Sequence, residues 1–336
     1  RWETTSTYNL GLDYGVLNGR ISGTVDYYYK KTKDVFGSMS SDPTLGFNQY
    51  NANTASIENK GLELMINSQN FSSAGFKWRT GFTASFNQNK VLAVQTKDKT
   101  SSYDIVEGTD LQKGYPMNAL FSYRYAGLND KGQPGVYDRN GNIKVLNTYG
   151  DAIVDVDFED LKFSGTTTPK YAIGLNNQFS VGAFDFSFLF MYYGGHVMRV
   201  QQAEPDESRF ISPLSGASNY WKQKGDELLT DVPGLAKYGT PGYYTFAARN
   251  GFTYGDRFVR KADYIRLRDI ILTYNLKSET LKKVGLNNSQ IRFQAQNPFK
   301  YTFSGNSIDA ESIDKRSGVR SLPQQAFYSL TLSTNF

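Results

Sequence analysis

The residue types that most often carry out chemistry are sparse in this chain of 336 residues. It has one histidine, His196, and no cysteine, so no disulfide, thiolate metal site or multi-histidine metal site can form. Asp157 and Glu159 form a close pair of carboxylates, but no G-x-S-x-G, H-E-x-x-H or glycine-rich phosphate loop accompanies them. We therefore predict that the protein is not an enzyme, and that His196 makes a hydrogen bond at the base of a loop.

Aromatic side chains are the second group that could bind a ligand, since they make up 15% of the chain. Aromatic rings stack on the apolar faces of sugars, while peptides offer backbone groups to polar loops. The alternative is that each ring packs one loop against another, or against a partner protein. The substrate-binding candidates lie in segments without a strand pattern: Tyr123, Tyr125, Trp221, Tyr243 and Tyr244.

Strands must hold these loops, because polar and apolar residues alternate with a period of two in nine stretches. A mean hydropathy of −0.51 beside 24 Tyr and 23 Phe suits many half-apolar strands better than one aliphatic core. No run of 18 apolar residues occurs, so no transmembrane helix is predicted. The fold class is therefore all-β, with strands at 8–16, 21–29, 62–66, 78–86, 171–179, 184–192, 270–276, 291–295 and 328–336.

The connections between these strands alternate strictly between short and long. Outer-membrane barrels show this arrangement, with short periplasmic turns and long extracellular loops, whereas a soluble sandwich gives no reason for it. Aromatic residues also gather at the strand ends, as the girdles of a membrane barrel do. We predict a transmembrane antiparallel β-barrel, with a secreted, soluble glycan-binding β-domain as an alternative. The long extracellular loops are expected at about 32–56, 91–168, 197–257 and 301–323.

The alternation also predicts which side chains line the interior. In a membrane barrel the apolar strand face meets lipid and the polar face meets the lumen. A charge placed at Leu64 or Phe188 should accordingly destabilise the barrel. The residues expected to face the lumen are Asn9, Asp13, Asp26, Glu63, Arg79, Thr83, Asn87, Gln294 and Gln296.

Nine strands do not make a complete barrel of the usual kind. Single-chain bacterial barrels have an even number of strands. The first and last stretches here run in the same direction, so at least one further strand must precede the first. We predict that the chain is the C-terminal part of a larger barrel. A passive barrel with an open lumen is a second alternative.

Five stretches of the sequence together resemble one family. The segment "A-S-I-E-N-K-G-L-E-L" is similar to a strand of TonB-dependent outer-membrane transporters. The other four are similar to the SusC/RagA family of Bacteroidetes nutrient transporters, and the resemblance covers nearly the whole chain. It implies that residues 1–336 are the last nine strands of a 22-stranded plugged barrel, without the plug, the TonB-interacting segment and the first strands. The four are "A-L-F-S-Y-R-Y-A-G-L-N-D-K-G-Q-P-G-V-Y-D-R-N-G-N", "E-D-L-K-F-S-G-T-T-T-P-K-Y", "Y-W-K-Q-K-G-D-E" and "A-D-Y-I-R-L-R-D-I-I-L-T-Y".

The same resemblance implies a function and partners. The protein would be a multi-pass outer-membrane importer of oligosaccharides or peptides, energised by the TonB–ExbB–ExbD complex and covered by a SusD-like lipoprotein. The lumen-facing residues would contact the plug or the translocation path. No cofactor is expected, and no nucleic acid, because Lys and Arg are scattered over the chain. The C-terminal strand would face lipid and act as the barrel-assembly signal through Tyr328, Leu330, Leu332 and Phe336.

Calcium is the one metal that the resemblance raises. Many relatives carry an acidic "D-x-N-x-D-G" stretch before the "P-K" strand. The glycine that makes the tight turn of a calcium loop is missing here, so we favour a solvated acidic loop and predict no metal site. The carboxylates of this stretch are Asp151, Asp155, Asp157, Glu159 and Asp160.

Overall fold

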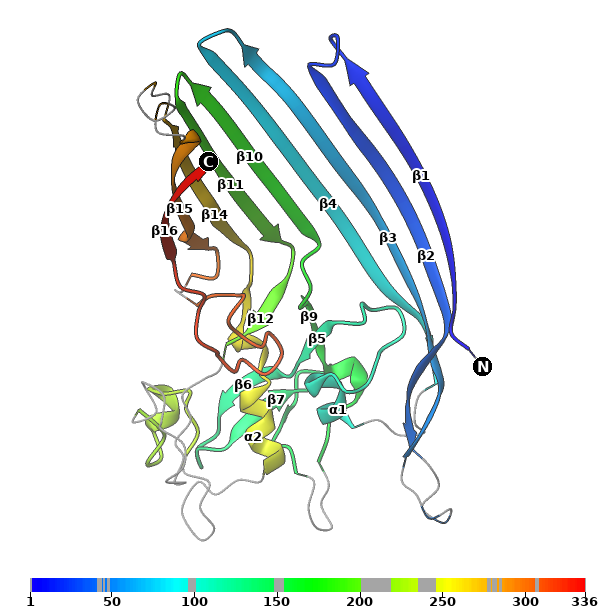
Figure 1. The fold of residues 1–336 in the computed structure, drawn as a ribbon. Coiled ribbons are helices and arrows are strands. Elements are labelled where there is room, and N and C mark those ends of the chain that lie inside the picture. Colours follow the sequence, from blue (N-terminus) through cyan, green and yellow to red (C-terminus); the bar gives the residue numbers. More distant parts are fainter. Residues whose placement is uncertain are drawn as a thin grey trace.

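The computed structural model contains one large antiparallel sheet, which rises from a group of folded loops at one end (Figure 1). The structure describes residues 2–40, 44, 46, 49–95, 101–147, 154–200, 219–234, 246–276, 279, 283, 286–305 and 308–335. Within these residues the sheet has nine strands, each paired with the next in the order given, and these confirm the nine predicted stretches. The strands are β1 (Thr4–Val16), β2 (Ile21–Ser40), β3 (Gln49–Ser72), β4 (Phe76–Val94), β10 (Tyr171–Val181), β11 (Phe184–Gly194), β14 (Tyr264–Asn275), β15 (Asn287–Thr302) and β16 (Phe327–Asn335).

The pairing register separates the sheet into a polar and an apolar face. Residues directly opposite each other in an antiparallel pair lie on the same face. Asp26 lies opposite Glu63, and Gln69 lies opposite Arg79. Following the pairs through β10, β11 and β14 places Gln294 of β15 on this same face. We call this face the polar wall. It carries every residue predicted to face the lumen: Asn9, Asp13, Asp26, Glu63, Arg79, Thr83, Asn87, Gln294 and Gln296.

The opposite face, which we call the apolar wall, leaves large side chains uncovered. Leu10 is 76% exposed, and Leu330 at the other end of the sheet is 75% exposed. Exposed apolar surface of this extent marks contact with an apolar phase or a partner. Aromatic rings on neighbouring strands also stack on the apolar wall. The ring centres of Trp78 and Phe179 are 5.7 Å apart, and those of Phe184 and Tyr274 are 4.7 Å apart.

The hairpin of β2 and β3 is much longer than the alternating pattern of the sequence predicted. β2 and β3 stay paired past residue 32, up to the pair Ser40 and Gln49, so most of the loop expected at 32–56 is strand. The two paired segments, 33–40 and 49–56, are largely polar on both faces, and a signal based on alternating polarity therefore disappears there. As a result β3 has 24 residues, whereas β16 has nine.

The other long connections fold together at one end of the sheet, and we call their described residues the loop domain (Figure 1). Its core brings together side chains such as Ile105, Phe121, Val136, Leu161 and Ala247. No helix in the described part of the chain is long and apolar enough to cross a membrane. The elements are α1 (Ser102–Glu107), β5 (Ala119–Ser122), β6 (Arg124–Leu128), β7 (Pro134–Tyr137), β8 (Ile143–Lys144), η2 (Phe158–Asp160), β9 (Lys162–Thr166), β12 (Val197–Arg199), η3 (Asp226–Leu228), α2 (Phe246–Thr253), η4 (Asp256–Phe258) and β13 (Val259–Lys261).

Candidate functional site in the polar wall and the loop domain

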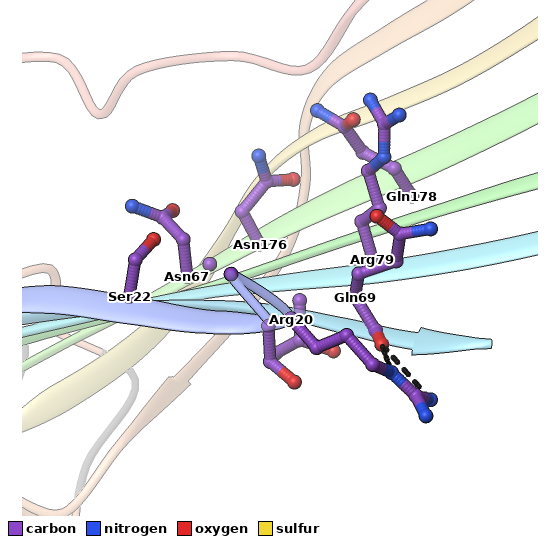
Figure 2. A pocket seen from close by; sticks show the side chains of 11 residues that line it. Arg20, Ser22, Asn67, Gln69, Arg79, Asn176 and Gln178 are labelled. Atoms are coloured by element: carbon purple, nitrogen blue, oxygen red, sulfur yellow. Dashed lines mark hydrogen bonds between the residues drawn. The ribbon is translucent and has the colours of Figure 1, made fainter. Parts of the chain in front are cut away.

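The polar wall contains a hollow of about 260 Å³ near the turn that joins β1 to β2. Ser22, Asn67, Gly81 and Asn176 lie opposite one another on four successive strands. Gly81 carries no side chain, so the row is open at its centre. Figure 2 shows the amides and hydroxyl of this row, with Arg79 and Gln178 beside them.

Two arginines give this hollow positive charge. Arg20 donates from its guanidinium to the backbone oxygens of Gln69, at 3.4 Å, and Asn70, at 2.9 Å, and so fastens the turn to β3. Arg79 has no ion pair within the described residues. An uncommitted guanidinium beside several amides suits a carboxylate or a polar backbone. Contact of this wall with a plug or with cargo stays a prediction.

Tyr123, one of the substrate-binding candidates, lies deep in the loop domain and is 2% exposed. Its hydroxyl is 2.8 Å from Oγ of Ser102, which in turn is 2.5 Å from Oδ1 of Asp155. Burial raises the pKa of the Tyr123 phenol, with Asp155 adding to the effect, so the group stays protonated. These residues line a second cavity, of about 140 Å³, between α1 and α2.

Trp221 and Tyr125 pack within the loop domain. Trp221 is 4% exposed, covers Gly132 and Gly234, and donates from Nε1 to Glu227 at 3.0 Å. A side chain at Gly132 would collide with the indole, which explains the need for glycine. The Tyr125 hydroxyl donates to the backbone oxygen of Asp231 at 3.0 Å. Tyr243 and Tyr244 lie outside the described residues, so the role of all these rings in substrate binding remains a prediction.

Arg199 is a buried hub that the sequence did not reveal. It is 1% exposed and donates to the backbone oxygen of Phe121 at 2.8 Å and to that of Arg316 at 2.6 Å. Its guanidinium also lies 4.7 Å from the ring centre of Tyr254. Burial lowers the pKa of Arg199 to about 10, so the side chain stays charged at neutral pH. One cation therefore joins three of the long connections.

A second buried cation ties the last long connection to the wall. Arg266 of β14 is 2% exposed and donates to Asp309 at 2.7 Å, while Lys300 of β15 reaches the same carboxylate at 3.1 Å. Glu311 binds both Arg266 and Arg268. The signal was present in the sequence, since "Y-I-R-L-R-D" places two arginines in an otherwise apolar strand. What the sequence could not show was the partner, 43 residues away.

His196 does lie at the base of a loop, immediately after β11. It is 2% exposed, and neither of its ring nitrogens has a hydrogen-bond partner among the described residues. Asp263 is 3.6 Å from Nδ1, and its carboxylate accepts the backbone N–H of Gly195 at 2.9 Å. The predicted hydrogen bond is thus made by the backbone, not by the ring. Burial, with Lys315 nearby, lowers the pKa of His196 to about 4, so the ring is neutral.

The acidic stretch acts mainly through hydrogen bonds within the loop domain. Asp155 accepts from Ser102 and from the backbone N–H of Val156, and Asp160 accepts from the backbone of Arg139 at 2.8 Å. The Arg139 guanidinium pairs with Asp157 at 2.9 Å. Among the described residues, no group of three or more His, Asp or Glu side chains is arranged to hold a metal ion. Asp151 lies outside them.

The residues of the proposed assembly signal lie on the apolar wall, as far as the structure describes them. Tyr328, Leu330 and Leu332 share one face of β16 and are 60%, 75% and 70% exposed. β16 pairs with β15 on one side, and its other edge has no partner among the described strands. Phe336 lies outside the described residues. Recognition of this strand during assembly remains a prediction.

The family model for the TonB-dependent receptor-like β-barrel matches residues 1–297 of the chain. The chain belongs to this TonB-dependent receptor family. It is 28% identical over 90% of its length to TonB-dependent receptor P39 of Formosa agariphila, and 26% identical over 89% of its length to TonB-dependent receptor SusC of Bacteroides thetaiotaomicron. It spans 32% and 29% of those two proteins, respectively.

Solved structures show the same fold for this receptor barrel. The RagAB peptide importer in its "closed-closed" state matches with a TM-score of 0.73 at 20% identity, covering all of this chain and 36% of that one. These relatives confirm the resemblance to the SusC/RagA type. The chain is therefore a nine-stranded portion of an outer-membrane β-barrel, and its sheet does not close because it is only part of that barrel.

Proposed function

We propose that this receptor barrel is part of an importer that uses energy from TonB to carry nutrients across the outer membrane. The observation that supports this most is the two-faced sheet. One face exposes Leu10, Leu330 and Leu332, and lipid would cover it, while the other is lined by charged and amide side chains that a polar cargo or plug could contact. A secreted soluble domain would need another layer over the apolar wall.

The importer works with partners that bind at its two ends. A SusD-like lipoprotein covers the loop domain, which offers a folded surface at one end of the sheet (Figure 1). The TonB–ExbB–ExbD complex supplies the energy for import. The cargo is an oligosaccharide or a peptide. Fold likeness to a peptide importer and sequence likeness to SusC support this range without choosing within it.

Uptake by cells that carry the full-length protein tests the proposal. Labelled oligosaccharides and peptides should enter only when the protein is present, and entry should stop when tonB is deleted or the proton gradient is dissipated. Uptake that survives both treatments would identify a passive barrel. Recovery of the full-length protein in the soluble fraction without detergent would contradict the membrane location. The lipoprotein should co-purify with the wild-type barrel from detergent extracts.

A further inference from the structure

The cavity between α1 and α2 has an unusual balance of hydrogen-bonding groups. It holds about 140 Å³ and is lined by Ser102, Tyr103, Tyr123, Asp155 and Asn250, with apolar contact from Leu146 and Ala247. An engineered protein cavity of about 150 Å³ accommodates one benzene molecule. The space therefore suits one ring-sized group of a larger ligand.

The protons of the three hydroxyl and carboxyl groups can be assigned. Asp155 can only accept, so Ser102 spends its single proton on Oδ1 of Asp155, at 2.5 Å. Tyr123, 2.8 Å away, must then donate to Oγ of Ser102. The phenol oxygen of Tyr123 is left as an acceptor. Oδ2 of Asp155 receives only a long contact of 3.5 Å from the backbone N–H of Ser102, and is a second available acceptor.

Asn250 supplies a hydrogen-bond donor, which the other polar groups of the cavity lack. It is 7% exposed, it lines the cavity, and its side-chain amide makes no hydrogen bond in the described part of the chain. With no partner among the described residues, this amide is free to bond to a ligand that enters the cavity. Its NH₂ donates and its oxygen accepts. The cavity thus offers both kinds of bonding beside the ring of Tyr103.

We propose that this cavity binds two neighbouring hydroxyl groups of a single sugar ring, at the end or edge of a glycan. Each hydroxyl both donates and accepts, so one can donate to Asp155 while another accepts from Asn250. Aromatic side chains provide an apolar wall for the ring. The inference rests on the proposed importer and narrows its cargo, or part of it, to glycans.

A peptide amino terminus fits less well. Its ammonium group would have to approach Asp155, but Lys144 already places a positive charge there, with Nζ 3.4 Å from the backbone oxygen of Asp155. Like charges at such short range disfavour a second cation. A sugar hydroxyl is neutral and meets no such repulsion.

Binding of defined glycans to the purified full-length protein in detergent tests the inference. The probes are maltohexaose, laminarihexaose, xylohexaose and mannohexaose, with hexa-alanine as the peptide probe, all followed by isothermal titration calorimetry at up to millimolar concentrations. At least one glycan should bind to the wild type. Asn250→Leu and Asp155→Asn should each weaken that binding about tenfold, the effect of one lost hydrogen bond.

A matched control separates the cavity from general charge effects. Glu159 is an exposed carboxylate in the same loop as Asp155. Glu159→Gln removes the same charge as Asp155→Asn and should leave binding unchanged. Asp155→Asn keeps an oxygen to accept from Ser102, so it tests the cavity even if Asn250→Leu disturbs α2. The inference is overturned if no glycan binds, if the two variants bind glycan as the wild type does, or if hexa-alanine binds and both variants weaken it. Uptake that still depends on TonB in those variants would leave the importer proposal intact.

Discussion

In the nine-stranded sheet, each strand pairs with its neighbours through a repeating backbone ladder, whereas the loop domain is joined by single side chains that act over long sequence distances. Arg199 contacts residues 78 and 117 positions away in the chain. The sheet spreads its stability over many equivalent bonds, so one substitution seldom removes much of it. The loop domain concentrates stability in a few buried charges. The two regions should therefore respond differently to comparable substitutions.

The largest difference is expected for Arg199→Leu. The change leaves the backbone oxygens of Phe121 and Arg316 without their charged donor, and charge-assisted hydrogen bonds contribute roughly 1.5–3 kcal/mol each, so the loop domain should lose about 4–5 kcal/mol. Urea unfolding of the loop domain, followed by Trp221 fluorescence in a background with Trp2→Phe and Trp78→Phe, measures the loss. The exposed Arg260→Leu on the paired strand β13 is the control and should change little. An equal loss of stability in both variants would contradict the role of Arg199 in joining the loops.

Arg266→Leu tests the junction between the two regions. It leaves Asp309 buried with only Lys300 as a charged partner, and breaking one side of a buried pair costs about 3–5 kcal/mol. Hydrogen exchange of residues 308–321 should become faster while that of β14 stays slow. Adding Asp309→Leu should recover much of the loss, because the uncompensated charge is then gone. Without such recovery, the pairing would not be the source of the effect.

Leu64→Arg tests the apolar wall alone. A charged side chain near the bilayer midplane should destabilise the barrel by about 2–4 kcal/mol, and unfolding from lipid vesicles measures it. Its neighbour Met65 lies on the polar wall, opposite Thr83. Met65→Arg is therefore the matched control, and we expect it to be tolerated. If Met65→Arg destabilised the barrel and Leu64→Arg did not, the polar wall would be the face that meets lipid.

The smallest effect concerns pH and His196. The pKa of this ring falls from 6.5 to about 4 in the folded protein, so between these values the unfolded chain binds a proton that the folded one does not. Stability is therefore full above pH 6.5 and falls as the pH drops, by about 2 kcal/mol at pH 5. Urea midpoints of the loop domain at pH 8 and pH 5 measure this. His196→Met should reduce the pH dependence; an unchanged slope would show that this ring is not its source.

The sequence predicted the sheet well because a period of two is a local property. Asp13 and Gln294 were placed on one face from their neighbours alone, and the register agrees. The prediction stopped where the alternation of polar and apolar residues stops, since β2 and β3 stay paired through residues 33–40 and 49–56, which are largely polar. In the loop domain, the sequence shows which residue types are present but not which distant residues they contact. Trp221 and Tyr123 were recognised as important rings, yet only the folded chain shows how deeply they are buried.

The unequal heights of the strands have a consequence for access from outside. At about 3.3 Å per residue, β3 is close to 80 Å long and β16 about 30 Å, while roughly 9–11 residues suffice to cross a bilayer. The β2–β3 hairpin therefore continues far beyond a bilayer, to about the level that α2 of the loop domain reaches (Figure 1). A macromolecule that approaches from the loop side would therefore meet the hairpin and the loop domain together.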